Sequence, residues 1–297
     1  MLTRRDALLG VAALGACAAA PSRAEAQAAE RIAAIETRIG GRVGVAAIDT
    51  QSGARILHRA QERFALCSTF KWLLAAQILQ LSEHGFDLGA RMLYSESDLL
   101  EYAPATRARL AEGGMNALDL CEAAVVLSDN TAANLLLVPG GGPEGLTHFL
   151  RANGDSMTRL DRIEPDLNEN APGDPRDTTT PLAMAQNARW FLSGEAQVGG
   201  VAMGPPLNAV SRARLVGWMV ACETGRARLR GGFPASWRAG DKTGTGARGA
   251  ANDVAIVWPP GRAPIVVAVY LSGSEAPLDA LNVAHAEIGR IVAESWG

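Results

Sequence analysis

Segments with strand character lie near both ends of this chain, and segments with helical character fill the stretch between them. Residues 42–50 and 54–60 read as two strands joined by a turn at residues 51–53, which predicts a β-hairpin. Strand patterns return near the other end, at residues 236–246, 251–259 and 264–273. Because the backbone groups of a strand need partners, we expect the two groups to form one antiparallel sheet.

Helical periodicity characterises the middle of the chain and both flanks of the predicted sheet. Apolar residues repeat at helical spacing in residues 28–39, 70–81, 118–127, 132–137, 143–150, 181–191, 207–221 and 277–296. We therefore expect an α/β fold in two parts, with a sheet flanked by helices and an inserted all-helical domain. Residues 27–66 and 207–297 are assigned to the sheet domain, and residues 67–206 to the helical domain. The latter includes a long irregular segment, residues 158–181, of a kind that is usually functional.

The overall composition is that of a globular protein with a small-molecule partner. Hydrophobic residues make up 48% of the 297 residues and charged residues 20%, which excludes a disordered or fibrous chain. The formal net charge is −3 and the sequence pI is about 5.9. Nucleic-acid binding requires a clustered basic surface, which this balance argues against. We expect a monomer that binds a small molecule and no nucleic acid.

The first 26 residues read as an export signal and not as part of the fold. Arg4 and Arg5 precede an apolar run at residues 7–20 that is too short to span a bilayer, and residues 24–26 have the small-x-small form of a cleavage site. The paired arginines favour the twin-arginine route. An alternative stays open, because the residues ending at Cys17 also resemble a lipoprotein processing box. We expect a periplasmic protein, with lipid anchoring through Cys17 as the second choice.

The cysteines and histidines give no indication of a metal centre. The four cysteines are Cys17, Cys67, Cys121 and Cys222, so three remain after the predicted cleavage. The sequence has no C-x-x-C motif and its four histidines are scattered, so we expect no metal site and no cofactor. Cys121 lies in an apolar helical pattern and is expected to be a buried hydrophobic residue.

Lysine is rare in this chain and occurs at two positions, Lys71 and Lys242, while the 28 basic residues are otherwise arginine. Ser68 lies at the start of a predicted helix, and Lys71 follows three residues later on the same face, beside the serine hydroxyl. An amine can take the proton of a serine nucleophile if its pKa is lowered, whereas a guanidinium stays protonated. A solvent-facing helix lysine is the alternative, but arginine would serve equally well there.

Two further motifs carry polar groups suited to a bound ligand. Lys242, Thr243 and Gly244 lie at the end of a predicted strand, where a cation, a hydroxyl and an open backbone suit a carboxylate group. Ser128 and Asn130 belong to an S-D-N sequence after an apolar helix, and their hydroxyl and amide can relay a proton and hold a carbonyl. Alone, the S-D-N sequence reads as a helix junction.

Together, the motifs S-x-x-K, S-D-N and K-T-G in this order are those of penicillin-binding proteins and class A β-lactamases. The chain resembles a class A serine β-lactamase across essentially its whole mature length. This resemblance implies the two-part fold described above and hydrolysis of the β-lactam amide bond of penicillins and cephalosporins. The reaction would pass through a serine acyl-enzyme on Ser68 and would give antibiotic resistance.

The long loop contains the feature that distinguishes a hydrolase from a transpeptidase among the proteins that this chain resembles. Residues 162–168, RIEPDLN, look like the E-x-x-L-N element of the class A omega loop. By that resemblance, Glu164 and Asn168 hold the water that attacks the acyl-enzyme, and Arg162 and Asp177 close the loop by a salt bridge. A carboxylate suits the role of proton acceptor. Whether Lys71 or Glu164 is the base for acylation is disputed for the family and is left open here.

The resemblance also implies a set of substrate-binding residues. The oxyanion hole would consist of the backbone N–H groups of Ser68 and Thr245. The substrate carboxylate would be bound by Lys242, Thr243, Thr245 and an arginine. Some members carry that arginine on the strand after K-T-G; here Arg228 matches the location that other members use. Tyr102 resembles the aromatic residue at the rim of the cleft, with a shift of one residue.

Cys67, next to the nucleophile, has no evident partner. Some carbapenem-hydrolysing members form a disulfide between this cysteine and one shortly after K-T-G, where this chain has Gly246. The sequence therefore gives no support for carbapenem hydrolysis. Rival functions are a β-lactam receptor that acylates without turnover, which the E-x-x-L-N element argues against, and a Ser-His-Asp esterase, for which the G-x-S-x-G motif is missing.

Overall fold

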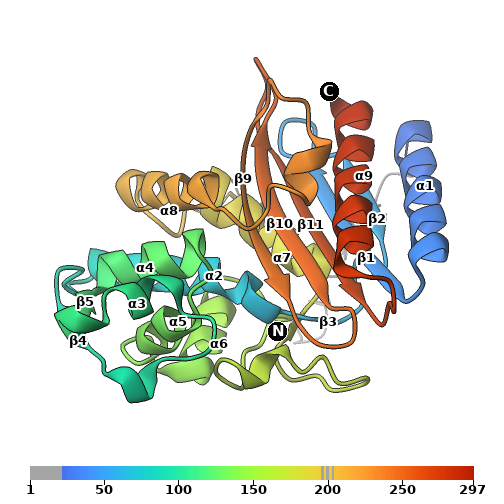
Figure 1. Ribbon diagram of the computed structural model, residues 1–297. Coiled ribbons are helices and arrows are strands. Elements are labelled where there is room, and N and C mark those ends of the chain that lie inside the picture. The colour runs from blue at the N-terminus through green and yellow to red at the C-terminus, as the bar shows by residue number, and fades with distance from the viewer. Residues whose placement is uncertain (1–21, 195–196, 199–200, 203) are drawn as a thin grey trace, which may run out of the picture.

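The computed structural model describes residues 22–194, 197–198, 201–202 and 204–297. Its centre is a five-stranded antiparallel sheet with the strand order β2-β1-β11-β10-β9 (Figure 1). The strands are β1 (Arg42–Asp49), β2 (Arg55–His58), β9 (Arg238–Thr245), β10 (Ala251–Trp258) and β11 (Ile265–Ser272). The pairing of β1 with β11 joins the two ends of the chain, which confirms the predicted sheet.

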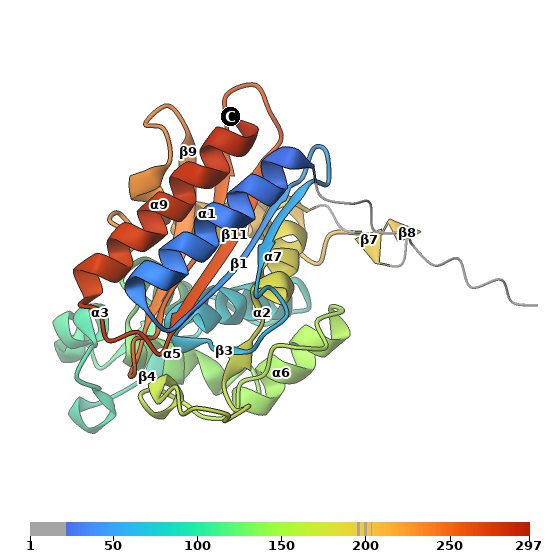
Figure 2. The same cartoon turned by 90° about the vertical axis from the view of Figure 1, so that its right-hand side faces the viewer.

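One face of the sheet is covered by the two terminal helices. α1 (Arg23–Ile39) and α9 (Leu278–Trp296) lie side by side across it (Figure 2). The helix α1 begins with a capping box, in which Ser22 and Glu25 bond each other's backbone N–H groups. The predicted cleavage after residue 26 would fall in the first turns of α1, and residues 1–21 of the predicted signal lie outside the described residues. The signal therefore stays a prediction.

The other face of the sheet packs against α7 (Pro181–Ala188), which contacts β1, β10 and β11. The sequence predicts one helix over residues 181–191, but the structure changes to a π-helical turn, η5, at Arg189–Ser193. That turn ends at Gly194, whose φ of 77° suits glycine. A helix from the segment assigned to the helical domain thus covers the sheet, and the predicted domain boundaries stay a prediction.

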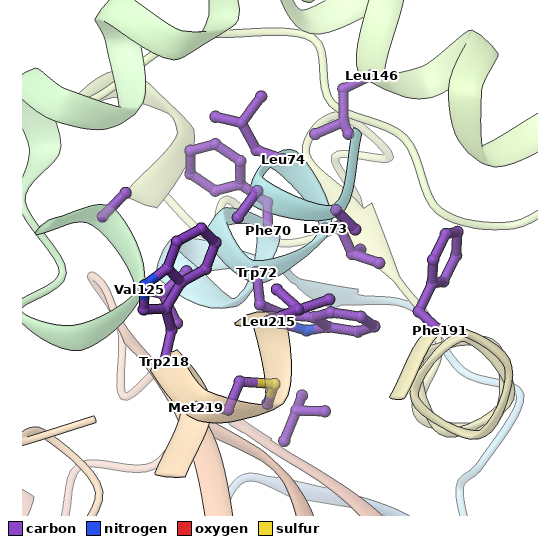
Figure 3. Close-up of a cluster of buried hydrophobic side chains, with 14 of the residues drawn as sticks. Phe70, Trp72, Leu73, Leu74, Val125, Leu146, Phe191, Leu215, Trp218 and Met219 are labelled. Atoms are coloured by element: carbon purple, nitrogen blue, oxygen red, sulfur yellow. The ribbon is translucent and has the colours of Figure 1, made fainter. Parts of the chain in front are cut away.

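The helical part surrounds one central helix, α2 (Phe70–Glu83). Its side chains from Phe70 to Leu79 are buried on all sides, as expected for a helix in the middle of a core (Figure 3). Trp72 and Leu73 pack with Leu215 and Met219 in the same cluster. The surrounding helices are α3 (Pro104–Ala108), α4 (Ala117–Val126), α5 (Asn130–Leu137), α6 (Gly142–Ala152) and α8 (Ala209–Ala221). Since this cluster also includes residues of β10 and β11, sheet and helices share one core.

Short elements complete the fold and fix its loops. β3, which lies just before the nucleophile region, pairs with β6, which lies at the end of the long loop. This pairing fixes the end of the loop next to the nucleophile region. These elements are β3 (Phe64–Ala65), β4 (Arg91–Leu93), β5 (Gly114–Asn116), β6 (Thr178–Thr179), β7 (Gln197–Val198), β8 (Val201–Ala202), η1 (Cys67–Thr69), η2 (Glu96–Asp98), η3 (Leu110–Glu112), η4 (Asp166–Asn168) and η6 (Leu229–Gly232). Among the described residues, a helix long and apolar enough to cross a membrane does not occur.

Candidate active site

Ser68 lies in η1, directly before α2, at the junction of sheet and helices. Gly244 on β9 lets the sheet edge approach it, because a Cβ at Gly244 would lie 3.0 Å from the Leu66 carbonyl oxygen and 3.1 Å from the Ser68 nitrogen. Asn252 on β10 donates to the carbonyl oxygens of Ala65 (2.9 Å) and Leu66 (3.1 Å). Sequence reasoning missed Asn252, since nothing local in the sequence links it to residues so far away.

Lys71 is fully buried and lies among oxygen atoms of three residues, which belong to the long loop and the S-D-N sequence. Its Nζ is 3.0 Å from Glu164 Oε1 and donates to the Ser128 carbonyl oxygen (2.8 Å) and to Asn130 Oδ1 (2.5 Å). Burial lowers the pKa of the Lys71 ammonium, and the Glu164 carboxylate opposes this shift. Because it is surrounded by these acceptors and has a lowered pKa, Lys71 is suited to proton transfer and is not the solvent-facing lysine of the alternative interpretation.

Glu164 connects the nucleophile, the lysine and the long loop. Ser68 Oγ donates to Glu164 Oε1 (3.4 Å), and Asn168 Nδ2 donates to Glu164 Oε2 (2.5 Å). The backbone of Glu164 is held at both polar groups by the side-chain amide of Asn134 (2.9 and 3.0 Å). The sequence predicts Lys71 beside the Ser68 hydroxyl, and in the structure both groups contact the same oxygen, Glu164 Oε1.

The long loop is closed by the predicted salt bridge. Arg162 Nε lies 2.6 Å from Asp177 Oδ2, and the other oxygen of this buried carboxylate accepts from the backbone N–H groups of Asp161 and Arg162, both at 2.8 Å. Asp161 Oδ2 in turn accepts from the Asp177 N–H (2.9 Å). These reciprocal bonds join the two ends of the loop and hold Glu164 beneath the nucleophile.

In the S-D-N segment, the first and third residues contribute to the site and the middle residue stabilises the fold. Asp129 is buried, caps α5 by accepting from the Ala132 N–H (2.8 Å), and also accepts from the N–H groups of Ala105 and Thr106 (2.9 Å each). Ser128, at a φ of 61°, is thereby held in the cleft. The middle residue thus stabilises the fold, while Ser128 and Asn130 contribute the polar groups that the sequence predicts for the site.

Lys242 lies on the other side of Ser128. Its Nζ donates to Ser128 Oγ (3.0 Å) and to the Thr243 carbonyl oxygen (2.8 Å). Burial lowers the pKa of Lys242 to about 8, and the charge of Lys71 contributes in the same direction. Ser128 therefore lies between the two lysines, bonded to one through its carbonyl oxygen and to the other through its hydroxyl.

A pocket of about 450 Å³ opens above these groups. Lys71, Glu164 and Lys242 are buried beneath it, so the structure brings all twelve predicted site residues together. Thr224, Leu278 and Asn282 also line the pocket, and sequence reasoning missed them because they belong to no local motif. The predicted residues in the lining are Ser68, Tyr102, Ser128, Asn130, Asn168, Arg228, Thr243, Gly244 and Thr245.

Comparison with known proteins decides the family. The model of the Beta-lactamase enzyme family matches residues 27–296. The solved structure of an ancestral (GNCA) class A β-lactamase superposes with a TM-score of 0.85 at 53% sequence identity, and the match covers 91% of this chain and 100% of that one. The chain belongs to the class A β-lactamases. The putative class A β-lactamase PenP from Rhodopseudomonas palustris is similar too, with a TM-score of 0.85, 49% identity and coverage of 90% and 99%.

Relatives known from sequence agree with this assignment. β-Lactamase AST-1 of Nocardia asteroides is 47% identical over 270 residues, which cover 90% of this chain and 83% of that protein. β-Lactamase L2 of Stenotrophomonas maltophilia is 45% identical over 286 residues, which cover 96% and 91%. This class A β-lactamase therefore hydrolyses the β-lactam amide bond of penicillins and cephalosporins through a serine acyl-enzyme and confers antibiotic resistance.

Arg228 of this β-lactamase is a buried residue that also reaches the pocket. Its Nη1 donates to the carbonyl oxygens of Gly244 (2.8 Å) and Asn252 (2.6 Å), its Nη2 to Thr245 Oγ1 (2.7 Å), and its Nε to Asn282 Oδ1 (2.9 Å). Arg228 therefore fixes the end of β9 and places a positive charge behind Thr245. Tyr102 is half exposed at the rim, and its carbonyl oxygen accepts from the Asn130 N–H (3.0 Å).

The cysteines of this β-lactamase are free and buried, as far as the described residues go. Burial raises the pKa of the Cys67 thiol to about 12, so it stays protonated. Gly246 packs against this thiol, because a Cβ there would lie 2.7 Å from Cys67 Sγ. Cys67 thus fills space behind the hairpin that carries K-T-G, and Cys121 is buried in the helical core as predicted.

Proposed function

We propose that Ser68 is the nucleophile of this β-lactamase and that Glu164 is the base for deacylation. The observation that carries this assignment is the position of the Glu164 carboxylate. One of its oxygens lies 3.4 Å from Ser68 Oγ and 3.0 Å from Lys71 Nζ, while the other accepts from Asn168. A base within reach of the nucleophile, oriented by a third group, is the arrangement that nucleophilic catalysis requires.

In the acylation step, Ser68 Oγ attacks the β-lactam carbonyl carbon and the ring C–N bond breaks. The hydroxyl proton passes to Glu164 or Lys71, both of which lie in the same hydrogen-bonded group. The leaving nitrogen takes a proton from Ser128, whose hydroxyl lines the pocket and is bonded to Lys242. The proton that left Ser68 passes on through Lys71 to Ser128, so that Glu164 is a carboxylate again before deacylation. The developing oxyanion is stabilised by the backbone N–H groups of Ser68 and Thr245.

In the deacylation step, a water molecule attacks the ester carbonyl carbon and Glu164 takes its proton. The ester C–O bond breaks, and Ser68 recovers a proton as the product acid leaves. Asn168 Oδ1 is buried and accepts no hydrogen bond from the described residues, so it supplies an acceptor for that water. The substrate carboxylate is bound by Thr243, Thr245 and the charges of Lys242 and Arg228 behind them.

The test is the replacement Glu164→Ala in the purified mature chain. We expect wild type to hydrolyse a chromogenic cephalosporin, and E164A to accumulate a covalent adduct, seen as a mass increase on Ser68 in a proteolytic digest. D166N removes an exposed carboxylate of the same loop and should turn over normally. Turnover by E164A at the wild-type rate, without an adduct, would show that Glu164 is not the base for deacylation.

We also propose that the enzyme is an exported periplasmic monomer whose signal comprises residues 1–26. The paired arginines and the cleavage-like residues 24–26 support this proposal, with lipid anchoring through Cys17 as the alternative. Cell fractionation separates the two, since a lipidated enzyme stays with the membrane and is released by C17S. N-terminal sequencing of the mature chain gives the cleavage site, and sedimentation gives its oligomeric state.

A further inference from the structure

A second hollow, of about 570 Å³, lies along the long loop that runs beneath the sheet in Figure 1. Its walls come from that loop, from the starts of β1 and β3, from the β9–β10 hairpin and from the end of β11. It shares no lining residue with the substrate pocket. We call it the arginine hollow, after the five arginines that line it: Arg42, Arg63, Arg162, Arg176 and Arg248.

Arginines outnumber carboxylates in the lining of the hollow. The carboxylates in the lining are Glu62 and Asp174, and Asp177 and Glu169 pair with Arg162 from outside it. Phe64 and Leu167 are buried and give the hollow an apolar part as well. A concave site of this volume, with an apolar part and charged groups that can orient a ligand, has the size of a small-molecule site.

Three of the arginines already have carboxylate partners. Arg42 pairs with Glu62 (3.0 Å), Arg162 with Asp177 (2.6 Å) and Arg176 with Asp174 (2.6 Å). These carboxylates neutralise the three guanidinium charges within the fold. The anion-binding capacity of the hollow must therefore come from the remaining two arginines.

Arg63 and Arg248 bond neutral oxygens instead. Arg63 Nη1 donates to the Met157 carbonyl oxygen (2.8 Å) and to Thr178 Oγ1 (3.0 Å), and Arg248 Nη1 donates to the Glu169 carbonyl oxygen. Within the described residues, neither guanidinium forms an ion pair. A guanidinium that keeps free N–H groups beside a cavity binds carboxylate or phosphate oxygens in a bidentate manner.

We propose that the arginine hollow binds a small anion with at least two carboxylate or phosphoryl groups, held by Arg63 and Arg248. Such an anion would join β3 to the β9–β10 hairpin and to the long loop. The hairpin and the loop are already linked there, because Asn170 Nδ2 donates to the Ala247 carbonyl oxygen (3.1 Å) and the Ala247 N–H donates to the Asn168 carbonyl oxygen (2.9 Å). The bound anion therefore stabilises the folded enzyme.

The experiment measures binding of citrate and of inorganic pyrophosphate by calorimetry, with thermal unfolding in parallel and sodium chloride at equal ionic strength as the salt control. We expect both R63Q/R248Q and R248Q to bind at least one of the anions about tenfold more weakly than wild type, a loss of about 1.4 kcal/mol. R55Q/R290Q, which removes two exposed arginines elsewhere, should bind as wild type does.

The substrate pocket also attracts carboxylates, so the two sites must be separated. Competition there raises KM for the cephalosporin, and this rise should be equal in wild type and R63Q/R248Q. If the variants lose affinity for citrate alone, the ligand of the hollow is a polycarboxylate. If they lose affinity for pyrophosphate alone, it is a phosphorylated compound. If R63Q/R248Q fails to fold, R248Q carries the test, since Arg248 is exposed. Unchanged affinity for both anions in R248Q and in a folded R63Q/R248Q would overturn the proposal.

Discussion

The two sides of the substrate pocket contain the same residue type in different surroundings. On the α2 side, Lys71 lies 3.0 Å from the Glu164 carboxylate. On the β9 side, Lys242 donates to a hydroxyl and to a carbonyl oxygen, and no ion pair of the described residues includes it. An amine beside a carboxylate can exchange a proton with it, whereas an amine among neutral oxygens has no such partner and contributes a positive charge while it is protonated. The groups around each lysine, more than the residue type, therefore determine whether it transfers a proton or binds the substrate.

The largest effect should come from replacing the proton-transferring lysine by arginine. We expect K71R to lower kcat for a chromogenic cephalosporin by about 10³-fold, because a guanidinium does not give up its proton. K242R keeps the positive charge that substrate binding uses and is the matched control, with a loss of about tenfold or less. Equal losses in the two variants would remove the distinction between the two sides.

A smaller effect should come from the close approach of β9 to the nucleophile. In G244A the added Cβ meets the Leu66 carbonyl oxygen at 3.0 Å and the Ser68 nitrogen at 3.1 Å, so the sheet edge must move away. Displacing an oxyanion-hole donor lowers kcat by about 10²-fold. G217A is the control, because its Cβ would meet nothing within 4 Å. Full activity in G244A would show that the hole tolerates this movement.

The smallest effect concerns the pH dependence of binding on the β9 side. The pKa of Lys242, lowered by burial to about 8, means that its charge is present below that pH and is lost as the pH rises through it. KM should therefore rise about fivefold between about pH 8 and pH 9, because the charged fraction of the amine falls from about one half to about one tenth. K242R should show no such rise, since arginine stays charged. A KM that stays constant in wild type would contradict the assigned role of Lys242.

Much of the fold could be predicted because strands need partners and because apolar periodicity marks helices. The hairpin of β1 and β2, the three C-terminal strands and the closing helix α9 all follow from local patterns. The position of α7 on the sheet could not be predicted, since a helix in the sequence does not indicate which layer it covers. Its contacts with β1 and β11 depend on residues far away along the chain.

The site residues within motifs could be predicted, whereas those that support them could not. Asn134 holds the backbone of Glu164, and Asn252 holds the backbone before Ser68, yet neither stands in a pattern that indicates such a role. The meeting of Ser68 and Lys71 at Glu164 Oε1 likewise depends on the closure of the long loop. Hydrogen bonds between distant segments have no local signature in one sequence.

The pairing of β1 with β11 also determines at what point during synthesis of the chain the sheet can fold. Arg42 at the start of β1 lies opposite Ser272 at the end of β11, so β1 has no neighbour on that side until nearly the whole chain has been synthesised. Long-range pairing of this kind slows folding, because a large loop must close first. A chain that ends before residue 265 would lack this central pairing, and its exposed strand would be open to association with other chains.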